Sequence, residues 1–305
     1  MSFRSVAILL GLVLASANPI KDNGPIMDRT VAPKGYKIQF VGHSFHVFLP
    51  TPLANLAKEA KIEGHETLNF DMLPASYPEQ HWAKMQRGQG VVKQNLQGTA
   101  ELLTLSTREV APDPAIAQFA DFAYQNNQNI KVMVQETWLP VAANDAEGCT
   151  PARVGPGVRD ERLTFCPLRD TATLPQLQAT VSDWSQPIAK MLRTQLTGLN
   201  AKYKSNVTSL VPVWNGVLEL RMLIVKGDVP GVAKQSSLFM DALGHPQQPL
   251  QDFVTYMWFA CMYGVSPVGM KALSTNAAQA KVLQELAWRH AQEESLRNAV
   301  LQVAS

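Results

Sequence analysis

Short apolar runs alternate along the chain with longer stretches in which apolar residues recur every three or four positions. The runs predict buried strands at 37–41, 67–72, 101–106, 130–134, 209–213 and 238–240. The helical spacing predicts helices at 50–62, 79–86, 112–125, 174–200, 216–225, 250–263 and 276–303. The run at 101–106 suits a helix equally well. Alternation of this kind predicts an α/β fold, with a parallel sheet of about five strands and helices on both faces.

Residues 1–17 have the pattern of a secretory signal peptide. Arg4 gives a positive start, residues 6–14 are apolar but too few to cross a bilayer, and the segment ends in an A-x-A cleavage site. The alternative, a buried N-terminal helix, is disfavoured by the Asn-Pro pair that follows. We therefore expect a secreted, extracellular protein, in which residues 18–35 are an extended lead-in and residues 36–305 a single domain. No other run predicts a membrane span.

The composition is typical of a globular protein. Of its 305 residues, 46% are hydrophobic and 17% are charged, which is enough apolar material for one sizeable core. The formal net charge is +2, and the positive residues do not cluster. The sequence therefore argues against nucleic acid as a partner.

The cysteines and one sequon agree with export. Cys149 and Cys166 lie in a stretch, residues 139–173, that is rich in Gly, Pro, Arg and Asp and has little periodicity. In an oxidising compartment they can form a disulfide, which predicts a pinned loop beside the functional site. Cys261 lies in an apolar run and is expected to be a buried free thiol. Asn206 begins the N-x-[ST] triplet and is a possible glycosylation site.

A candidate nucleophile follows the first predicted strand. The strand at 37–41 runs into Gly42-His43-Ser44, which places Ser44 at the carboxyl edge of the sheet, where ligands bind in open α/β folds. Backbone N–H groups at such a turn favour developing negative charge. Asp241 and His245 follow the strand predicted at 238–240. His245 is the candidate base, and Asp241 is an acid that can orient its imidazole ring. The alternative is that Ser44 only caps the next helix.

These motifs, with the polar pair Gln135-Glu136 after a middle strand, make the chain similar to the SGNH, or GDSL-type, hydrolases over about residues 37–263. The resemblance implies a three-layer α/β/α, flavodoxin-like fold with strand order 2-1-3-4-5. It also implies hydrolysis of esters without metal or cofactor. Ser44 would be the nucleophile and, through its N–H, an oxyanion donor, and His245 the general base with Asp241 beside it.

The sequence departs from the family pattern in the groups that would form an oxyanion hole. His43 stands where the family has Asp or Asn. The second block lacks its glycine, so the resemblance assigns a backbone N–H of Ala75 or Ser76 to the hole. Gln135 replaces the asparagine of the third block and is the predicted carboxamide donor.

The spacing between Asp241 and His245 differs from the family pattern, and the turn at Ser44 differs from the nucleophile turn of another hydrolase class. Three residues separate Asp241 from His245, where the family has two, which leaves Asp252 as an alternative acid. The G-x-S-x-G elbow of α/β-hydrolases is excluded, because His46 stands where its last glycine would be.

The sequence thus predicts a secreted serine esterase, monomeric and free of metal and cofactor, that hydrolyses an acyl ester on a carbohydrate or another extracellular substrate. The departures leave open a second reading, a binding protein on the same fold that has lost the chemistry. His43 and His46, with His65 and His81, raise a third, a metal-dependent hydrolase, although H-x-x-H without H-E-x-x-H is weak evidence.

Two further groups have a structural and a functional interpretation. Glu136 is interpreted as a partly exposed loop carboxylate rather than as a second acid. Four tryptophans can line a cleft if they converge, although core packing is the expected place of each one: Trp82, Trp138, Trp214 and Trp258.

Overall fold

The computed structural model describes residues 33–73, 78–107, 111–138, 151–153, 159–164, 170–240 and 244–303. Several predictions concern residues outside these ranges and stay predictions. They are the signal peptide at 1–17, the disulfide between Cys149 and Cys166, and the roles of Ala75, Ser76 and Asp241. Residues 33–305 form one compact unit.

A five-stranded parallel sheet forms the centre of this unit, in the order β2-β1-β3-β4-β7. Its strands are β1 (Lys37–Gly42), β2 (Glu66–Met72), β3 (Leu102–Ser106), β4 (Lys131–Gln135) and β7 (Thr208–Val211). Counted within this sheet, the order is 2-1-3-4-5, so the predicted flavodoxin-like fold is confirmed. A separate antiparallel pair joins β5 (Pro151–Arg153) to β6 (Arg159–Thr164).

Helices connect the successive strands, and these crossovers make the strands parallel and cover both faces of the sheet. All five residues of β3 are buried, and only the first residue of β1 is exposed. Near-continuous apolar runs of this kind are typical of strands buried on both sides. The ambiguous run at 101–106 is therefore a strand, paired with β1 on one side and with β4 on the other.

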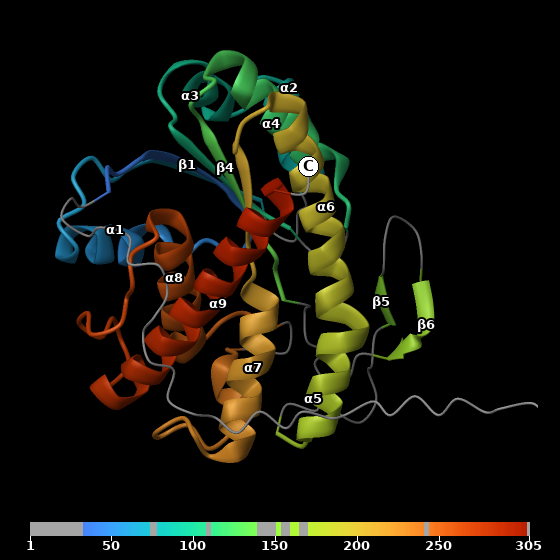
Figure 1. The fold of residues 1–305 in the computed structure, drawn as a ribbon, viewed down its shortest axis with the longest axis vertical. Helices are drawn as coiled ribbons and strands as arrows, with labels where there is room; N and C mark the ends of the chain where they lie inside the picture. The colour runs from blue at the N-terminus through green and yellow to red at the C-terminus, as the bar shows by residue number, and fades with distance from the viewer. Residues whose placement is uncertain are drawn as a thin grey trace, which may run out of the picture. The chain divides into compact units, whose positions relative to one another are not determined.

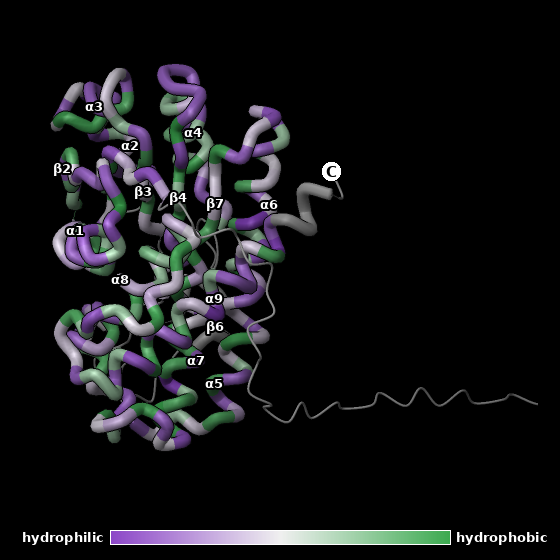
Figure 2. Tube along the Cα trace, turned by 60° about the vertical axis from the view of Figure 1, so that its left-hand side comes forward, coloured by the Kyte–Doolittle hydropathy of each residue, from purple (hydrophilic) through white to green (hydrophobic). Residues whose placement is uncertain are grey.

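Helices lie on the two faces in two groups. Figure 1 shows α2, α3 and α4 together on one side of the sheet and α1, α8 and α9 on the other. In Figure 2 the helices carry alternating hydrophilic and hydrophobic colour, as expected where one side of each helix covers the sheet. The α-helices are α1 (Pro50–Glu59), α2 (Pro78–Gln86), α3 (Val92–Gly98), α4 (Pro114–Asn126), α5 (Leu174–Thr180), α6 (Gln186–Tyr203), α7 (Val213–Lys226), α8 (Gln248–Tyr263) and α9 (Ala277–Val303).

The predicted helix at 174–200 is divided. A π-helical segment, Val181–Ser185, separates α5 from α6. Pro187 lies directly after this segment, within a continuous run of helical backbone, and because proline has no N–H it cannot donate a hydrogen bond to the preceding turn. The observed interruption thus lies next to Pro187. Ser185, the last residue of the π segment, is wholly buried.

The strand predicted at 238–240 is wrong. Gln235–Leu238 is a 3-10 helix, and Phe239 makes only a single antiparallel bridge, with Pro246. The chain reverses between them, with a positive φ of 84° at Gly244 and a hydrogen bond from Met240 N to His245 O of 2.8 Å. Because this segment pairs with itself, it does not join the central sheet. His245 therefore lies in the loop before α8 and not at the end of a strand.

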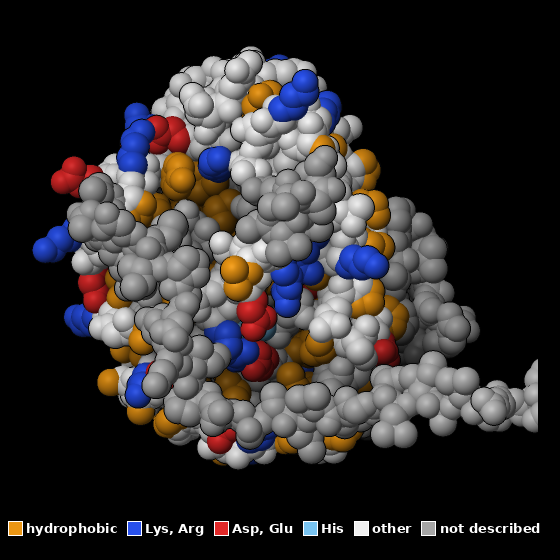
Figure 3. Space-filling model, viewed as in Figure 1, with side chains coloured by type: hydrophobic (Ala, Val, Ile, Leu, Met, Phe, Trp, Pro, Cys, Tyr) orange, Lys and Arg blue, Asp and Glu red, His pale blue; other side chains and the backbone are white. Residues whose placement is uncertain are grey.

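The surface drawn in Figure 3 carries positive and negative side chains interspersed among apolar ones. This mixture agrees with the small net charge of the sequence. In the described part of the chain, none of the helices combines the length and the apolar character needed to cross a bilayer.

Candidate active site

Ser44 and His245 lie in hydrogen-bond contact although 201 positions separate them in the sequence. The distance from His245 Nε2 to Ser44 Oγ is 2.8 Å. Ser44 lies in the turn that follows β1, and His245 lies in the loop before α8. Both side chains are partly exposed, so solvent and small molecules have access to the pair. A nucleophile and base within this distance are the first requirement of nucleophilic catalysis.

The turn that carries Ser44 is a single helical turn of the backbone. The N–H groups of His46 and Val47 both donate to His43 O, at 2.9 and 3.2 Å. The Ser44 N–H donates to none of the residues that the structure describes. The alternative reading of Ser44 as a helix cap is wrong, because α1 begins only at Pro50 and has Leu49 at its N-cap.

Gly42 allows this turn to lie close against the sheet. A Cβ atom at this position would be 2.9 Å from Ser106 Cβ and 3.1 Å from His46 Cβ. Any other residue would push the turn away from β3. The glycine is therefore required by close approach.

His43 fastens the turn to the neighbouring strand. The Phe45 N–H donates to His43 Nδ1 at 3.3 Å, so Nδ1 is an acceptor and the ring proton lies on Nε2. His43 Nε2 can then donate to Thr107 O, 3.0 Å away, directly after β3. Ser106 Oγ lies 3.1 Å from the same nitrogen. The residue that departs from the family pattern thus has a structural role.

A buried carboxamide lies beneath the turn. Trp258 Nε1 can only donate, and it does so to Gln135 Oε1 at 2.7 Å, which fixes the orientation of the amide. His46 Nδ1 lies 3.2 Å from the same oxygen and must be its donor. His46 Nε2 then accepts from Thr104 Oγ1 at 2.9 Å. Gln135, His46, Trp258 and Thr104 are all inaccessible to solvent.

This network keeps His46 neutral and occupies the amide of Gln135. Burial lowers the pKa of His46 to about 3, with a smaller contribution from the nearby His43. Gln135 Nε2 donates to Phe45 O at 3.2 Å and to Thr137 Oγ1 at 3.1 Å. Through the bond to Phe45 O, Gln135 fixes the position of the turn that carries Ser44. Its predicted donation to an oxyanion stays a prediction.

Aromatic contacts join the His245 loop to the Ser44 turn. Phe45 stacks on Trp138, with ring centroids 4.7 Å apart and planes 6° apart, and meets the ring of His245 edge-on at 5.3 Å. Trp138 Nε1 donates to Gly244 O at 3.0 Å. Phe45 and Trp138 are buried, so the two segments meet over an apolar support. Trp138 therefore serves the site through packing.

Other predicted residues lie away from this pair or make different contacts. Asp252, the alternative acid, accepts hydrogen bonds from Ser274 and Thr275, in the segment before α9. Asn206, the possible glycosylation site, is exposed just before β7, at the opposite, amino edge of the sheet. Cys261 is a free cysteine in α8, partly buried.

The histidines proposed for a metal site do not meet. Both nitrogens of His43 and of His46 are engaged with protein atoms, as described above. His65 Nδ1 lies 2.6 Å from Tyr263 Oη, and His81 Nδ1 lies 2.8 Å from Asp71 Oδ2. Within the described ranges, no three His, Cys, Asp or Glu side chains are grouped so that they could bind a metal ion.

Glu136, the residue after Gln135, is wholly buried, so its interpretation as a partly exposed carboxylate is wrong. Its oxygens lie 3.2 and 3.4 Å from Asn215 Nδ2, and Ser185 Oγ lies 3.4 Å away. Burial raises the pKa of Glu136 to about 8, against the attraction of Arg193. Burial therefore favours the protonated, neutral form of Glu136.

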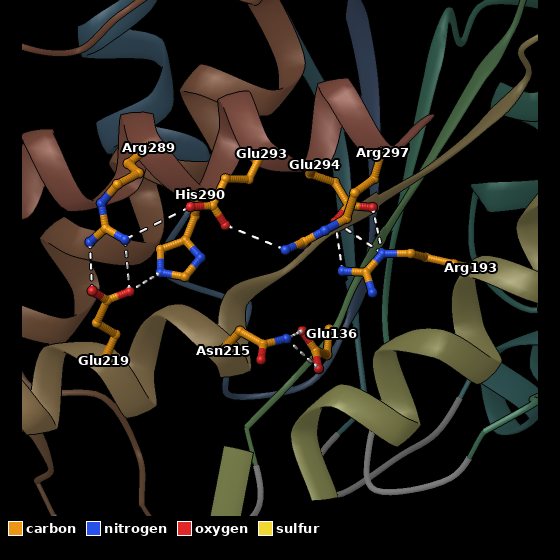
Figure 4. A network of polar contacts seen from close by, with 9 residues as sticks. All are labelled: Glu136, Arg193, Asn215, Glu219, Arg289, His290, Glu293, Glu294 and Arg297. Atoms are coloured by element: carbon orange, nitrogen blue, oxygen red, sulfur yellow. Dashed lines mark hydrogen bonds and ion pairs between the residues drawn. The ribbon is translucent and has the colours of Figure 1, made fainter. Parts of the chain in front are cut away.

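Ion pairs surround Glu136 and fasten α9 to α6 and α7 (Figure 4). Arg193 of α6 makes a bidentate pair with Glu294 of α9, at 2.7–3.0 Å. Glu219 of α7 binds Arg289 at 2.6 and 3.1 Å and His290 at 2.9 Å. These contacts hold the pKa of Glu219 down to about 2, although partial burial opposes this.

We expect Glu136→Gln to flatten the dependence of stability on pH. The folded protein binds a proton at Glu136 that the unfolded chain releases between pH 4.5 and 8, so wild-type stability falls as the pH rises through this window. The variant lacks this loss. From pH 5 to 8, the stability of the variant relative to wild type in urea denaturation should rise by about 3.5 kcal/mol, since each pKa unit corresponds to about 1.4 kcal/mol.

Glu219→Gln is the control of opposite sign. The pKa of Glu219 is lowered, so its stabilising effect is present above the unfolded pKa near 4.5 and is lost on acidification toward pH 2. This variant should be less stable than wild type at pH 7, and the difference should shrink in acid. Parallel pH profiles for wild type and Glu136→Gln would show that Glu136 is ionised in the folded protein.

Gln135→Leu should slow the reaction of Ser44 with a fluorophosphonate, because the turn loses the donor to Phe45 O. It should also destabilise the protein by about 1–3 kcal/mol per buried group left unpaired. Gln284→Leu is the matched control. Gln284 is similarly buried and binds the backbone of Gly269 and Met270. It does not contact Ser44 or His245, the pair that we call the dyad. It should cost similar stability in urea and leave the labelling rate unchanged; equal labelling rates for both variants would exclude a positioning role for Gln135.

Comparison with known proteins gives a distant structural likeness. No protein-family model matches the chain, and the search of curated proteins finds no match. Among solved structures, the chain is similar to a protein from Parabacteroides merdae ATCC 43184 that is provisionally described as a GDSL-like lipase. The two are 11% identical with a TM-score of 0.41, and the match covers 75% of this chain and 95% of that chain.

Proposed function

We propose that the chain is a serine hydrolase of the SGNH type that cleaves carboxylic esters through Ser44 and His245. The observation that supports this most strongly is the 2.8 Å contact between His245 Nε2 and Ser44 Oγ. It lies at the carboxyl edge of a parallel sheet with order 2-1-3-4-5, the edge at which ligands bind in such folds. The sequence motifs alone predicted Ser44 as the nucleophile and His245 as the base.

In the proposed reaction, His245 Nε2 takes the proton of Ser44 Oγ as the oxygen attacks the ester carbonyl. The tetrahedral oxyanion is stabilised by the Ser44 N–H, which donates to no described residue. His245 then passes its proton to the leaving alcohol oxygen, and an acyl group remains on Ser44. Water, deprotonated by His245, then attacks this acyl group. The bond from the acyl carbon to Ser44 Oγ breaks, His245 returns the proton to Ser44 Oγ, and the carboxylic acid leaves. Asp241 stays the predicted acceptor for the other imidazole nitrogen, and Ala75 or Ser76 the predicted second oxyanion donor.

The wider setting of this reaction is also a proposal. We propose a secreted, extracellular and monomeric enzyme, free of metal and cofactor, whose substrate is an acylated carbohydrate or another extracellular ester. The signal-peptide pattern at residues 1–17 supports export.

The decisive experiment is hydrolysis of p-nitrophenyl acetate by the purified chain beside Ser44→Ala and His245→Ala. Each substitution should lower kcat/KM by at least about 10³-fold without unfolding the protein, since nucleophile and base act as a unit. Ser237→Ala, an exposed serine, and His65→Ala, a histidine at the amino edge of the sheet, are the matched controls and should retain activity.

A fluorophosphonate provides a test that does not depend on the choice of ester. Wild type should be labelled at Ser44 and Ser44→Ala should not be labelled. Absence of both turnover and labelling in a folded protein would reject the esterase and favour a binding protein on the same fold.

A further inference from the structure

Exposed apolar side chains gather on the segments that carry the dyad. The described residues contain seven large hydrophobic side chains with substantial exposure: Val47, Met72, Val91, Val225, Met240, Val268 and Leu296. Single exposed apolar residues are ordinary. Three of the seven, however, belong to the Ser44 turn or to segments hydrogen-bonded to Gly42 or His245, and we name these three, Val47, Met72 and Met240, the apolar rim.

Val47 lies on the same side of its turn as Ser44. The turn is helical, since Val47 N donates to His43 O, and residues three apart in such a turn are neighbours on one face. Val47 is 41% exposed, whereas Phe45 and His46 between them are buried. The nucleophile and an exposed apolar side chain are thus presented together.

Met72 approaches the same region from the adjacent strand. It is the register partner of Gly42, and Leu73 N donates to Gly42 O at 3.2 Å. Paired residues of parallel strands place their side chains on the same face of the sheet. A Cβ on Gly42 would meet His46, so this is the face over which the Ser44 turn passes. Met72 is 39% exposed there.

Met240 lies next to His245 across the reversal of the chain. Its N–H donates to His245 O at 2.8 Å, and its side chain is 61% exposed. The three side chains of the rim therefore come from three separate segments, and each segment is tied by a main-chain bond to the turn or the loop that carries the dyad.

We propose that the apolar rim binds the acyl chain of the ester, so that the enzyme prefers unbranched apolar acyl groups of about six or more carbons to acetyl. This inference rests on the proposed function and specifies its substrate class. Each methylene that leaves water on such a surface favours binding by up to about fourfold, and by roughly twofold where the surface stays half exposed. An octanoyl ester should then exceed an acetyl ester in kcat/KM by roughly ten- to a hundredfold.

The test compares p-nitrophenyl acetate, butyrate, hexanoate and octanoate, each below its solubility limit, with wild type and with Val47→Ser, Met72→Ser and Met240→Ser. Wild-type kcat/KM should rise with chain length. Each substitution on the rim should reduce the ratio of octanoate to acetate activity by roughly threefold or more. Val268→Ser and Leu296→Ser are the controls, because their exposures of 42% and 60% match those of Val47 and Met240. Both should keep the wild-type ratio.

The outcomes separate the two proposals. Acetate as the best substrate, hydrolysed in wild type and not in Ser44→Ala, would overturn the acyl-binding rim and leave the esterase standing. Rim variants that lose acetate and octanoate activity in equal proportion would also overturn it, since the side chains would then only support the fold. Absence of turnover and of fluorophosphonate labelling in the folded protein would overturn both.

Discussion

The amide of Gln135 imposes the constraint on which the candidate site depends. Because this side chain has no access to water, each of its polar atoms must find a partner inside the protein. Only one orientation satisfies Trp258, which can only donate, and the carbonyl of Phe45, which can only accept. The end of β4, the turn after β1 and helix α8 are thereby fixed relative to one another. A site assembled from segments far apart in sequence needs such a connection.

Gln135, the last residue of β4, and Glu136, the residue after it, belong to two separate groups of buried polar side chains. Gln135 serves the Ser44 turn with neutral hydrogen bonds, and its partner His46 is kept neutral by burial. Glu136 instead faces the ion pairs among α6, α7 and α9. Successive residues along an extended chain point in opposite directions, which explains how neighbours can belong to such different surroundings. The fixed charges that hold α9 are therefore kept apart from the network beneath the nucleophile.

The sequence predicted what depends on local pattern and missed what depends on distant contacts. The inner strands β1, β3 and β4 are predictable because burial on both faces makes them largely apolar, and the position of Ser44 because its turn follows such a strand. Helix α3 was missed because only Val92 and Leu96 of its residues are buried. The burial of Glu136 was not readable, since it depends on helices that begin about fifty residues or more later in the chain. His245 was predicted to follow a strand but lies in a loop that turns back through a bridge between Phe239 and Pro246.

The surroundings of the dyad bear on what the proposed chemistry can discriminate. His245 meets the edge of Phe45, and Phe45 stacks on Trp138, so the base is oriented over aromatic carbon. Aromatic carbon offers no hydrogen bond to a substrate. A hydroxyl-rich acyl group would have to leave water without replacement bonds, whereas an alkyl chain gains from the same contact. Under the proposed function, selection at this site would come from shape and apolar area, and the side chains of Val47, Met72 and Met240, rather than a charged partner, would decide the substrate.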